Sequence, residues 1–211
     1  MTKARLEAFS DGVFAIIITI MVIELKVPHE SSLRALLAVK HEFLSYLLSF
    51  VFVGIYWSNH HHMLQAVERV NGRILWANLH LLFWLSLVPF VTSWMGGTEF
   101  ATWPVVAYGT VMLLAGFAYS ILTKVLIAHH GDESRLAKAV GRDFKGNVSL
   151  ILYLAAIALA FVDPIVACGI YVLVAIIWVI PDYRIESVLN ERNGQISEQM
   201  PSASADEAKL E

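Results

Sequence analysis

The chain has 211 residues, of which 57% are hydrophobic and 16% are charged. Soluble domains average about 25% charged residues, and the mean hydropathy of this chain is +0.63. The composition therefore excludes a soluble enzyme, a nucleic-acid-binding protein and a disordered chain, and it indicates a membrane protein with several spans. The net charge of −3 points to no nucleic-acid partner. The single cysteine, Cys168, excludes an intrachain disulfide framework and a metal site built from several cysteines.

Six apolar segments meet or approach the length of about 20 residues that a helix needs to cross a bilayer. The basic start resembles a secretory signal, but Asp11 and the absence of a small-residue cleavage site favour a retained first helix. The last apolar block is divided at Asp163-Pro164, because the residue before a proline disfavours the helical region. A single tilted helix or a re-entrant pair is the alternative there. The predicted spans are 8–26, 43–65, 74–95, 103–128, 147–162 and 164–181.

The basic residues are divided unevenly between the two sides of this six-span arrangement. Twelve of the fifteen lysines and arginines lie on the side that holds both termini, whereas Lys26, Arg34 and Lys40 lie on the other. Cytoplasmic loops carry an excess of basic residues, so both termini are predicted to be cytoplasmic. Residues 1–183 are predicted to form one transmembrane unit, and the polar residues 184–211 a disordered cytoplasmic tail.

The first predicted helix carries an apolar stripe and an ionisable residue on different faces. At 100° per residue, Ile16, Ile20 and Ile23 fall within one narrow sector with Thr19 beside it, whereas Asp11 lies roughly opposite. The pattern does not say whether the stripe faces lipid, protein or water. Because an ionisable group inside a membrane is costly, Asp11 is expected to turn into the bundle or to pair with a cation or polar group of another helix.

Three consecutive histidines in the second span resemble a metal-binding tract. Adjacent residues on a helix point about 100° apart, and no carboxylate or fourth histidine lies four residues away from them. No metal site is therefore predicted. Instead, His60 is expected to face inward with a hydrogen-bond partner, and His61 and His62 to lie near a membrane interface.

Particular sequence patterns coincide with the first three predicted spans. The segment Arg5-Leu6-Glu7-Ala8-Phe9-Ser10-Asp11 matches the pattern RxxxFSD at the start of the first helix. Trp57-x-x-His60 lies in the second span, and Asn78-Leu79 with Pro89-Phe90 lies in the third. In these patterns the chain resembles the transmembrane protein 175 family of lysosomal and bacterial potassium channels. The detailed resemblance covers the first three spans, and beyond them only the number of spans agrees.

The resemblance implies an all-α membrane protein in which four copies of a six-helix unit surround a central pore lined by the first helices. Hydrophobic side chains of that helix then form the constriction in place of a carbonyl filter. By position, these are Ile16, Ile20 and Ile23, flanked by Thr19. The resemblance further implies a modestly selective, passive flux of potassium and other monovalent cations across the plasma membrane of a bacterium, with no cofactor.

The resemblance also gives the motif residues Arg5, Phe9, Ser10 and Asp11 a structural role, in which polar contacts hold the first helix. Arg5 is itself a candidate cation for Asp11, between helices. The expected partners on other helices are Trp57, Asn59, His60 and Asn78.

A secondary transporter is the alternative function, with Asp11 or His60 as the proton or ion site. It predicts saturable flux coupled to pH. Apart from the break at Asp163-Pro164, the sequence lacks the paired discontinuous helices that are typical of such transporters. No combination of nucleophile, base and metal ligands is present, which argues against a membrane enzyme.

Overall fold

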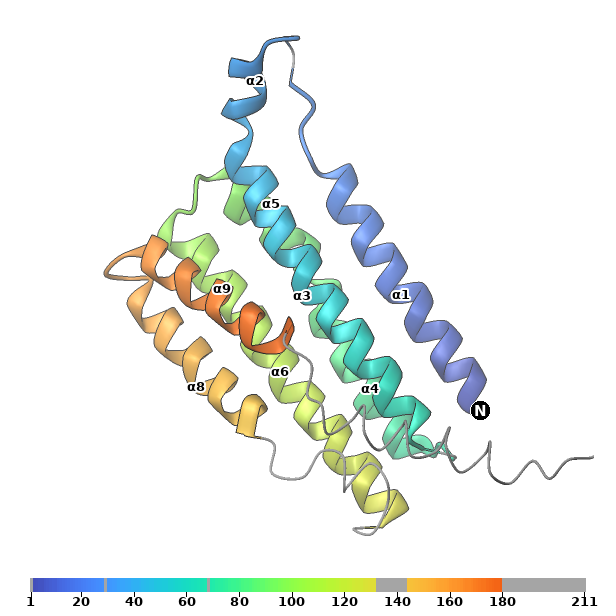
Figure 1. Cartoon of the computed structure of the whole chain (residues 1–211). Helices are drawn as coiled ribbons and strands as arrows, with labels where there is room; N and C mark the ends of the chain where they lie inside the picture. Colours follow the sequence, from blue (N-terminus) through green and yellow to red (C-terminus); the bar gives the residue numbers. More distant parts are fainter. Residues whose placement is uncertain (1, 29, 68, 132–143, 180–211) are drawn as a thin grey trace, which may run out of the picture.

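The computed structural model describes residues 2–28, 30–67, 69–131 and 144–179. The predicted tail over 184–211 lies outside these residues. The helices are α1 (Lys3–Ile23), α2 (Leu33–Ala38), α3 (Lys40–Gln65), α4 (Gly72–Ser86), α5 (Val88–Gly97), α6 (Thr102–His130), α8 (Phe144–Leu159) and α9 (Pro164–Val179). They form an elongated bundle in which α1 occupies one edge and the hairpin of α8 and α9 the other (Figure 1).

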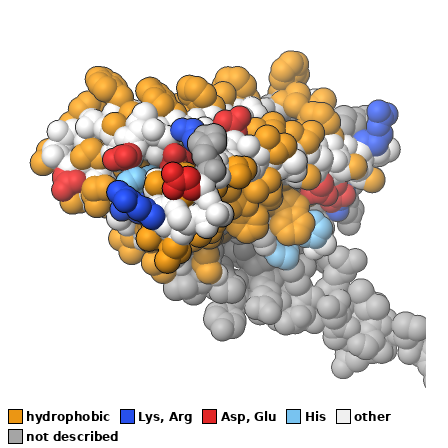
Figure 2. Space-filling model, turned by 90° about the horizontal axis from the view of Figure 1, so that it is seen from above, with side chains coloured by type: hydrophobic (Ala, Val, Ile, Leu, Met, Phe, Trp, Pro, Cys, Tyr) orange, Lys and Arg blue, Asp and Glu red, His pale blue; other side chains and the backbone are white. Residues whose placement is uncertain are grey.

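Within the described ranges, three helical segments are long and apolar enough to cross a membrane, namely Lys3–Ile23, Gly72–Gly97 and Thr102–His130. At 1.5 Å per residue, α1 reaches about 31 Å, which matches the hydrocarbon core of about 30 Å. Helices α8 and α9 are apolar but have only 16 residues each. Hydrophobic side chains make up much of the outline of the molecule seen from above (Figure 2). An exposed apolar surface of this extent indicates contact with lipid or with other subunits.

The predicted span 74–95 consists of two helices. Helix α4 ends at Ser86, α5 begins at Val88, and Pro89 lies in the first turn of α5. A proline has no backbone N–H and its ring clashes with the preceding turn, so a continuous helix breaks there. At the other end of α4, the Asn71 side chain accepts a hydrogen bond from the Ile74 amide at 3.0 Å, which caps the first turn.

The last apolar block folds as a helical hairpin. Helix α8 ends at Leu159, and α9 begins at Pro164, where the missing N–H costs nothing. The Asp163 carboxylate accepts a hydrogen bond from the Ile165 amide at 2.8 Å. The alternative of a single tilted helix through this block is therefore wrong.

Polar and small residues hold the interior together. The Ser49 hydroxyl is hydrogen-bonded to the Thr92 hydroxyl at 2.7 Å and donates to the Tyr108 hydroxyl at 3.2 Å, so one buried serine joins α3 to α5 and α6. Gly96 of α5 lies against α3, where a Cβ atom would be 2.7 Å from the Cα of Glu42. Small residues allow this close approach between membrane helices.

Replacing Gly109 by alanine is expected to destabilise the bundle by about 1–3 kcal/mol, the usual range for an overpacked interior. An added Cβ would collide with the Tyr171 hydroxyl. That hydroxyl donates to the Val105 carbonyl at 3.1 Å, so it cannot move aside without losing a buried hydrogen bond. Thermal unfolding in detergent measures the effect. The control is Gly169→Ala, where a Cβ meets nothing within 4 Å. Equal unfolding temperatures for the two variants would contradict the close packing of α6 on α9.

Candidate functional site

The isoleucine stripe of α1 lies on the exposed side of the bundle edge. Ile16, Ile20 and Ile23 are 59%, 42% and 72% exposed, and Phe9 is half exposed on the same helix. The buried residues of α1 are Leu6, Ser10, Phe14, Ile17 and Met21. They face α3, α4 and α5, on which α1 packs. One face of the helix is therefore fastened to the bundle, and the stripe contacts little within a single chain.

Two further residues of α1 accompany the stripe. Thr19 is exposed, and its hydroxyl donates to the Ala15 carbonyl at 2.8 Å, one turn earlier in the same helix. The hydroxyl proton is thus used within the helix, and the side chain remains exposed. Gly12 is also exposed, with nothing within 4 Å of the position of a Cβ. This face of α1 has room for a neighbouring molecule along its length.

A buried group of three polar side chains, here named the polar joint, connects α1 to α3 and α4. It consists of Ser10, His60 and Asn78, all almost completely buried. The Ser10 hydroxyl donates to the Leu6 carbonyl at 2.9 Å and accepts from the Asn78 amide nitrogen at 3.0 Å. The Asn78 oxygen therefore faces His60, whose Nε2 lies 2.7 Å away and must carry the proton. The joint satisfies both ends of the asparagine amide.

Asp11 lies beside the polar joint and pairs with α3. The Trp57 indole N–H donates to its carboxylate at 3.0 Å. The Trp57 ring is in turn stacked on His61, with ring centroids 6.0 Å apart. Arg5 makes no ion pair among the residues that the structure describes. Asp11 thus takes a neutral aromatic donor on another helix as its partner.

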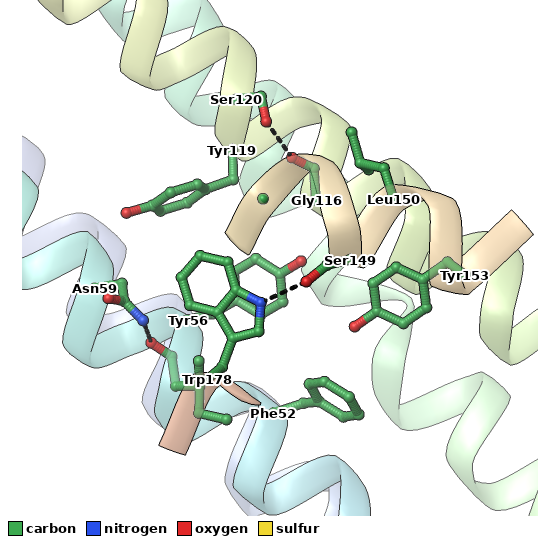
Figure 3. Close-up of a pocket in the computed structure, with 12 residues that line it drawn as sticks. Phe52, Tyr56, Asn59, Gly116, Tyr119, Ser120, Ser149, Leu150, Tyr153 and Trp178 are labelled. Carbon is green, nitrogen blue, oxygen red and sulfur yellow. Dashed lines mark hydrogen bonds between the residues drawn. The ribbon is translucent and has the colours of Figure 1, made fainter. Parts of the chain in front are cut away.

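Asn59 belongs to a different part of the bundle. Its side chain donates to the Ile55 carbonyl of its own helix at 2.9 Å, and it lines a narrow hollow between α3, α6, α8 and α9 (Figure 3). The hollow has a volume of about 40 Å³ and mostly apolar walls. Within it, the Trp178 indole N–H donates to the Ser149 hydroxyl at 2.8 Å. Asn59 therefore does not contact the motif of α1.

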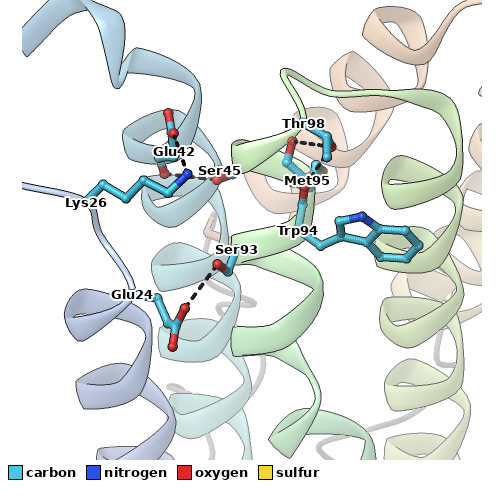
Figure 4. A network of polar contacts seen from close by, with 8 residues as sticks. All are labelled: Glu24, Lys26, Glu42, Ser45, Ser93, Trp94, Met95 and Thr98. Atoms are coloured by element: carbon cyan, nitrogen blue, oxygen red, sulfur yellow. Dashed lines mark hydrogen bonds and ion pairs between the residues drawn. The ribbon is translucent and has the colours of Figure 1, made fainter. Parts of the chain in front are cut away.

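The far end of α1 is fastened by a second set of polar contacts, shown in Figure 4. Ser93 of α5 donates to the Glu24 carboxylate at 3.2 Å. Lys26, in the segment that follows α1, lies 3.8 Å from the Glu42 carboxylate of α3. No sequence pattern gives Glu24 a partner, and its one signal is its position as an acidic residue directly after an apolar helix. Both ends of α1 are attached to the bundle, and the stripe lies between them.

These features define an all-α membrane protein whose first helix is held on one face and presents an apolar stripe on the other. The family model described as "Endosomal/lysosomal potassium channel TMEM175" matches residues 5–89, the stretch from the first turn of α1 to the first turn of α5. A potassium channel of Chryseobacterium sp. (strain P1-3) is 56% identical over 191 residues, which are 90% of this chain and 100% of that one.

A second relative and a solved structure agree with this match. A potassium channel of Chamaesiphon minutus is 30% identical over 189 residues, which are 82% of this chain and 91% of that one. The crystal structure of a lysosomal potassium-selective channel TMEM175 homologue from Chamaesiphon minutus has a TM-score of 0.75 and 29% identity, with 84% of this chain and 96% of that chain covered. The chain belongs to the TMEM175 family of potassium channels.

Proposed function

We propose that four copies of this chain assemble into a potassium channel whose central pore is lined by α1. The observation that carries the proposal is the division of α1 into two faces. Its packed face is fastened by the polar joint and by Asp11, whereas Ile16, Ile20 and Ile23 remain exposed at the edge of the bundle. Such a stripe must face something outside the single chain. In a tetramer with its four-fold axis beside α1, the stripe faces the central pore.

The same proposal sets the topology. Residues 1–183 form six spans, with α4 and α5 acting as one broken span and α8 and α9 as a short hairpin. Both termini lie in the cytoplasm, because twelve of the fifteen lysines and arginines are on that side. The membrane is the plasma membrane of a bacterium, and the residues 184–211 form a cytoplasmic tail.

Rings of isoleucine act as a gate by excluding water. A narrow hydrophobic constriction dewets when closed, and a small rotation or widening of the four α1 helices restores the water column. Potassium then flows passively down its electrochemical gradient. An isoleucine ring offers no oxygen atoms to replace the hydration shell, so selectivity over sodium is modest. The hydroxyl oxygens of Thr19, an exposed residue of α1, assist where they reach the axis.

A planar bilayer with potassium on one side and sodium on the other tests the proposed function. Purified protein is expected to give ohmic currents with a reversal potential that favours potassium. The opposing result is an absence of current together with saturable uptake driven by a pH gradient. That result would favour a transporter that uses Asp11 or His60, although both side chains already have hydrogen-bond partners on other helices.

Asp11→Ala is expected to reduce the yield of tetramer more than it changes selectivity. The carboxylate accepts the Trp57 N–H, a hydrogen bond that joins α1 to α3 and is exposed in the single chain. Its loss frees α1 to shift relative to α3. Size-exclusion chromatography with light scattering measures the tetramer fraction, which should fall several-fold.

Two tryptophan variants serve as controls for this prediction. Trp57→Phe keeps an aromatic ring at this position and removes the N–H donor, so it should reproduce the loss of tetramer. Trp103→Phe alters an exposed tryptophan of α6 and should leave assembly unchanged. A normal tetramer yield from Asp11→Ala would contradict the structural role of the motif.

A further inference from the structure

An open cleft lies between α4 and α6, at the end of the bundle where α4 begins and α6 ends. Its volume is about 870 Å³. The residues that line it are Asn71, Gly72, Arg73, Trp76, Ala77, His80, Ile121 and Val125. None of them belongs to α1, so the cleft is separate from the isoleucine stripe and from the polar joint.

The cleft combines a cationic mouth with apolar walls. Arg73 is exposed in the first turn of α4 and makes no ion pair among the described residues. Trp76, one turn further along the same face, is 73% exposed. Ile121 and Val125 form the opposite wall on α6. An arginine at a helix end followed by an exposed tryptophan is typical of the boundary between the apolar core of a membrane and its headgroups.

Among the residues that the structure describes, the charges at this end of the bundle are predominantly positive. Arg69 and Lys124 are exposed near the cleft, on the segment before α4 and near the end of α6. The described acidic residues at the same end already have partners. Glu7 lies 3.7 Å from Lys3, and Asp11 accepts the Trp57 N–H. Arg73 therefore has no acidic residue of the described chain to neutralise it.

We propose that this cleft binds an anionic phospholipid, with the phosphate on Arg73 and an acyl chain along Trp76, Ile121 and Val125. A membrane chain meets lipid wherever an apolar surface is open, and basic pockets between helices select anionic headgroups. A second copy of the chain fits less well, because a parallel neighbour would present the same positive end to Arg73. The inference depends on the membrane location of the chain and not on the proposed pore.

Native mass spectrometry of the purified chain tests the site with phosphatidylglycerol and phosphatidylcholine of identical acyl chains. One basic residue near the headgroup contributes about 1 kcal/mol, so phosphatidylglycerol should bind about fivefold more tightly. Arg73→Gln should remove that preference. Arg34→Gln, an exposed arginine on α2 at the opposite end, should retain it. Trp76→Ala should weaken the binding of both lipids equally, because it removes apolar contact and no charge.

Several results would overturn the lipid site. Equal binding of the two lipids by the unmodified chain would show that the headgroup charge is not recognised. A preference that persists in Arg73→Gln would place the site elsewhere. Disulfide cross-linking between copies through Trp76→Cys, with loss of bound lipid, would show that a second copy occupies the cleft. Circular dichroism and size-exclusion profiles matching the unmodified chain establish that each variant is folded.

Discussion

Ile16→Asn is expected to enlarge the leak current and to move the reversal potential between potassium and sodium toward zero. Asparagine has the same number of side-chain heavy atoms as isoleucine, but its amide holds water where the ring of isoleucines excludes it. Lowering the barrier of a closed hydrophobic ring by about 1.4 kcal/mol raises the rate of passage about tenfold. The side chain is 59% exposed in the single chain, so the substitution leaves the packed face of α1 intact.

A matched control separates a pore effect from a general effect of a polar residue in the membrane. Ile151 of α8 is 65% exposed and lies at the other edge of the bundle (Figure 1). Ile151→Asn should change neither conductance nor reversal potential. Unchanged currents in Ile16→Asn would remove Ile16 from the constriction. Equal effects of the two substitutions would point instead to a disturbed bilayer or a disturbed fold.

The two faces of α1 were predictable from the sequence, because they depend only on helical periodicity. An amphipathic division survives whatever the neighbouring helices are, so Ile16, Ile20 and Ile23 were placed together without tertiary information. The inward position of His60 followed from the same argument: only one of three consecutive helical residues can face the core. Resemblance to the family then directed attention to Ser10 and Asp11, which the structure places at contacts with other helices.

The partners in these contacts were not predictable, because a helical wheel gives the direction of a side chain and not the identity of what faces it. Several candidates fitted Asp11, and the structure selects Trp57. Asn59 was a candidate partner by sequence. Because it lies next to His60 on the same helix, its side chain points about 100° away from that of His60, which belongs to the polar joint. The Glu24–Ser93 contact joins residues 69 positions apart, which no local pattern detects.

Backbone breaks were predictable only where a proline coincided with a polar residue. Asp163-Pro164 divided the last apolar block correctly, because the length of the block already required two segments. Pro89 gave no such signal, since hydropathy summed over 74–95 is that of a single span. The break between α4 and α5 arises because Pro89 has no backbone N–H, and an average of side-chain hydropathy does not detect a backbone effect of this kind.

Asn78→Leu is expected to destabilise the bundle by about 1–3 kcal/mol, the cost of leaving a buried polar group without a partner. Leucine has the same number of side-chain heavy atoms as asparagine and the same branching at Cγ, so the shape of the side chain is largely kept. The His60 Nε2–H loses its acceptor at 2.7 Å, and the Ser10 hydroxyl loses its donor at 3.0 Å. Hydrogen bonds between membrane helices average only about 0.6 kcal/mol. A destabilisation near the upper end of the expected range would therefore show that His60 finds no other acceptor.

Thermal unfolding in detergent measures this effect, and Asn59→Leu is the matched control. Asn59 is half-buried, and its amide donates to the Ile55 carbonyl of its own helix, so its loss should lower the unfolding temperature less.

The double variant Asn78→Leu with His60→Leu should recover part of the stability. Both partners of the hydrogen bond between residues 60 and 78 are then replaced by apolar side chains, and no imidazole N–H is left without an acceptor. Since the joint fastens α1, Asn78→Leu should also broaden the distribution of current amplitudes. If Asn78→Leu and Asn59→Leu unfold at the same temperature, the polar joint is not what holds the first helix.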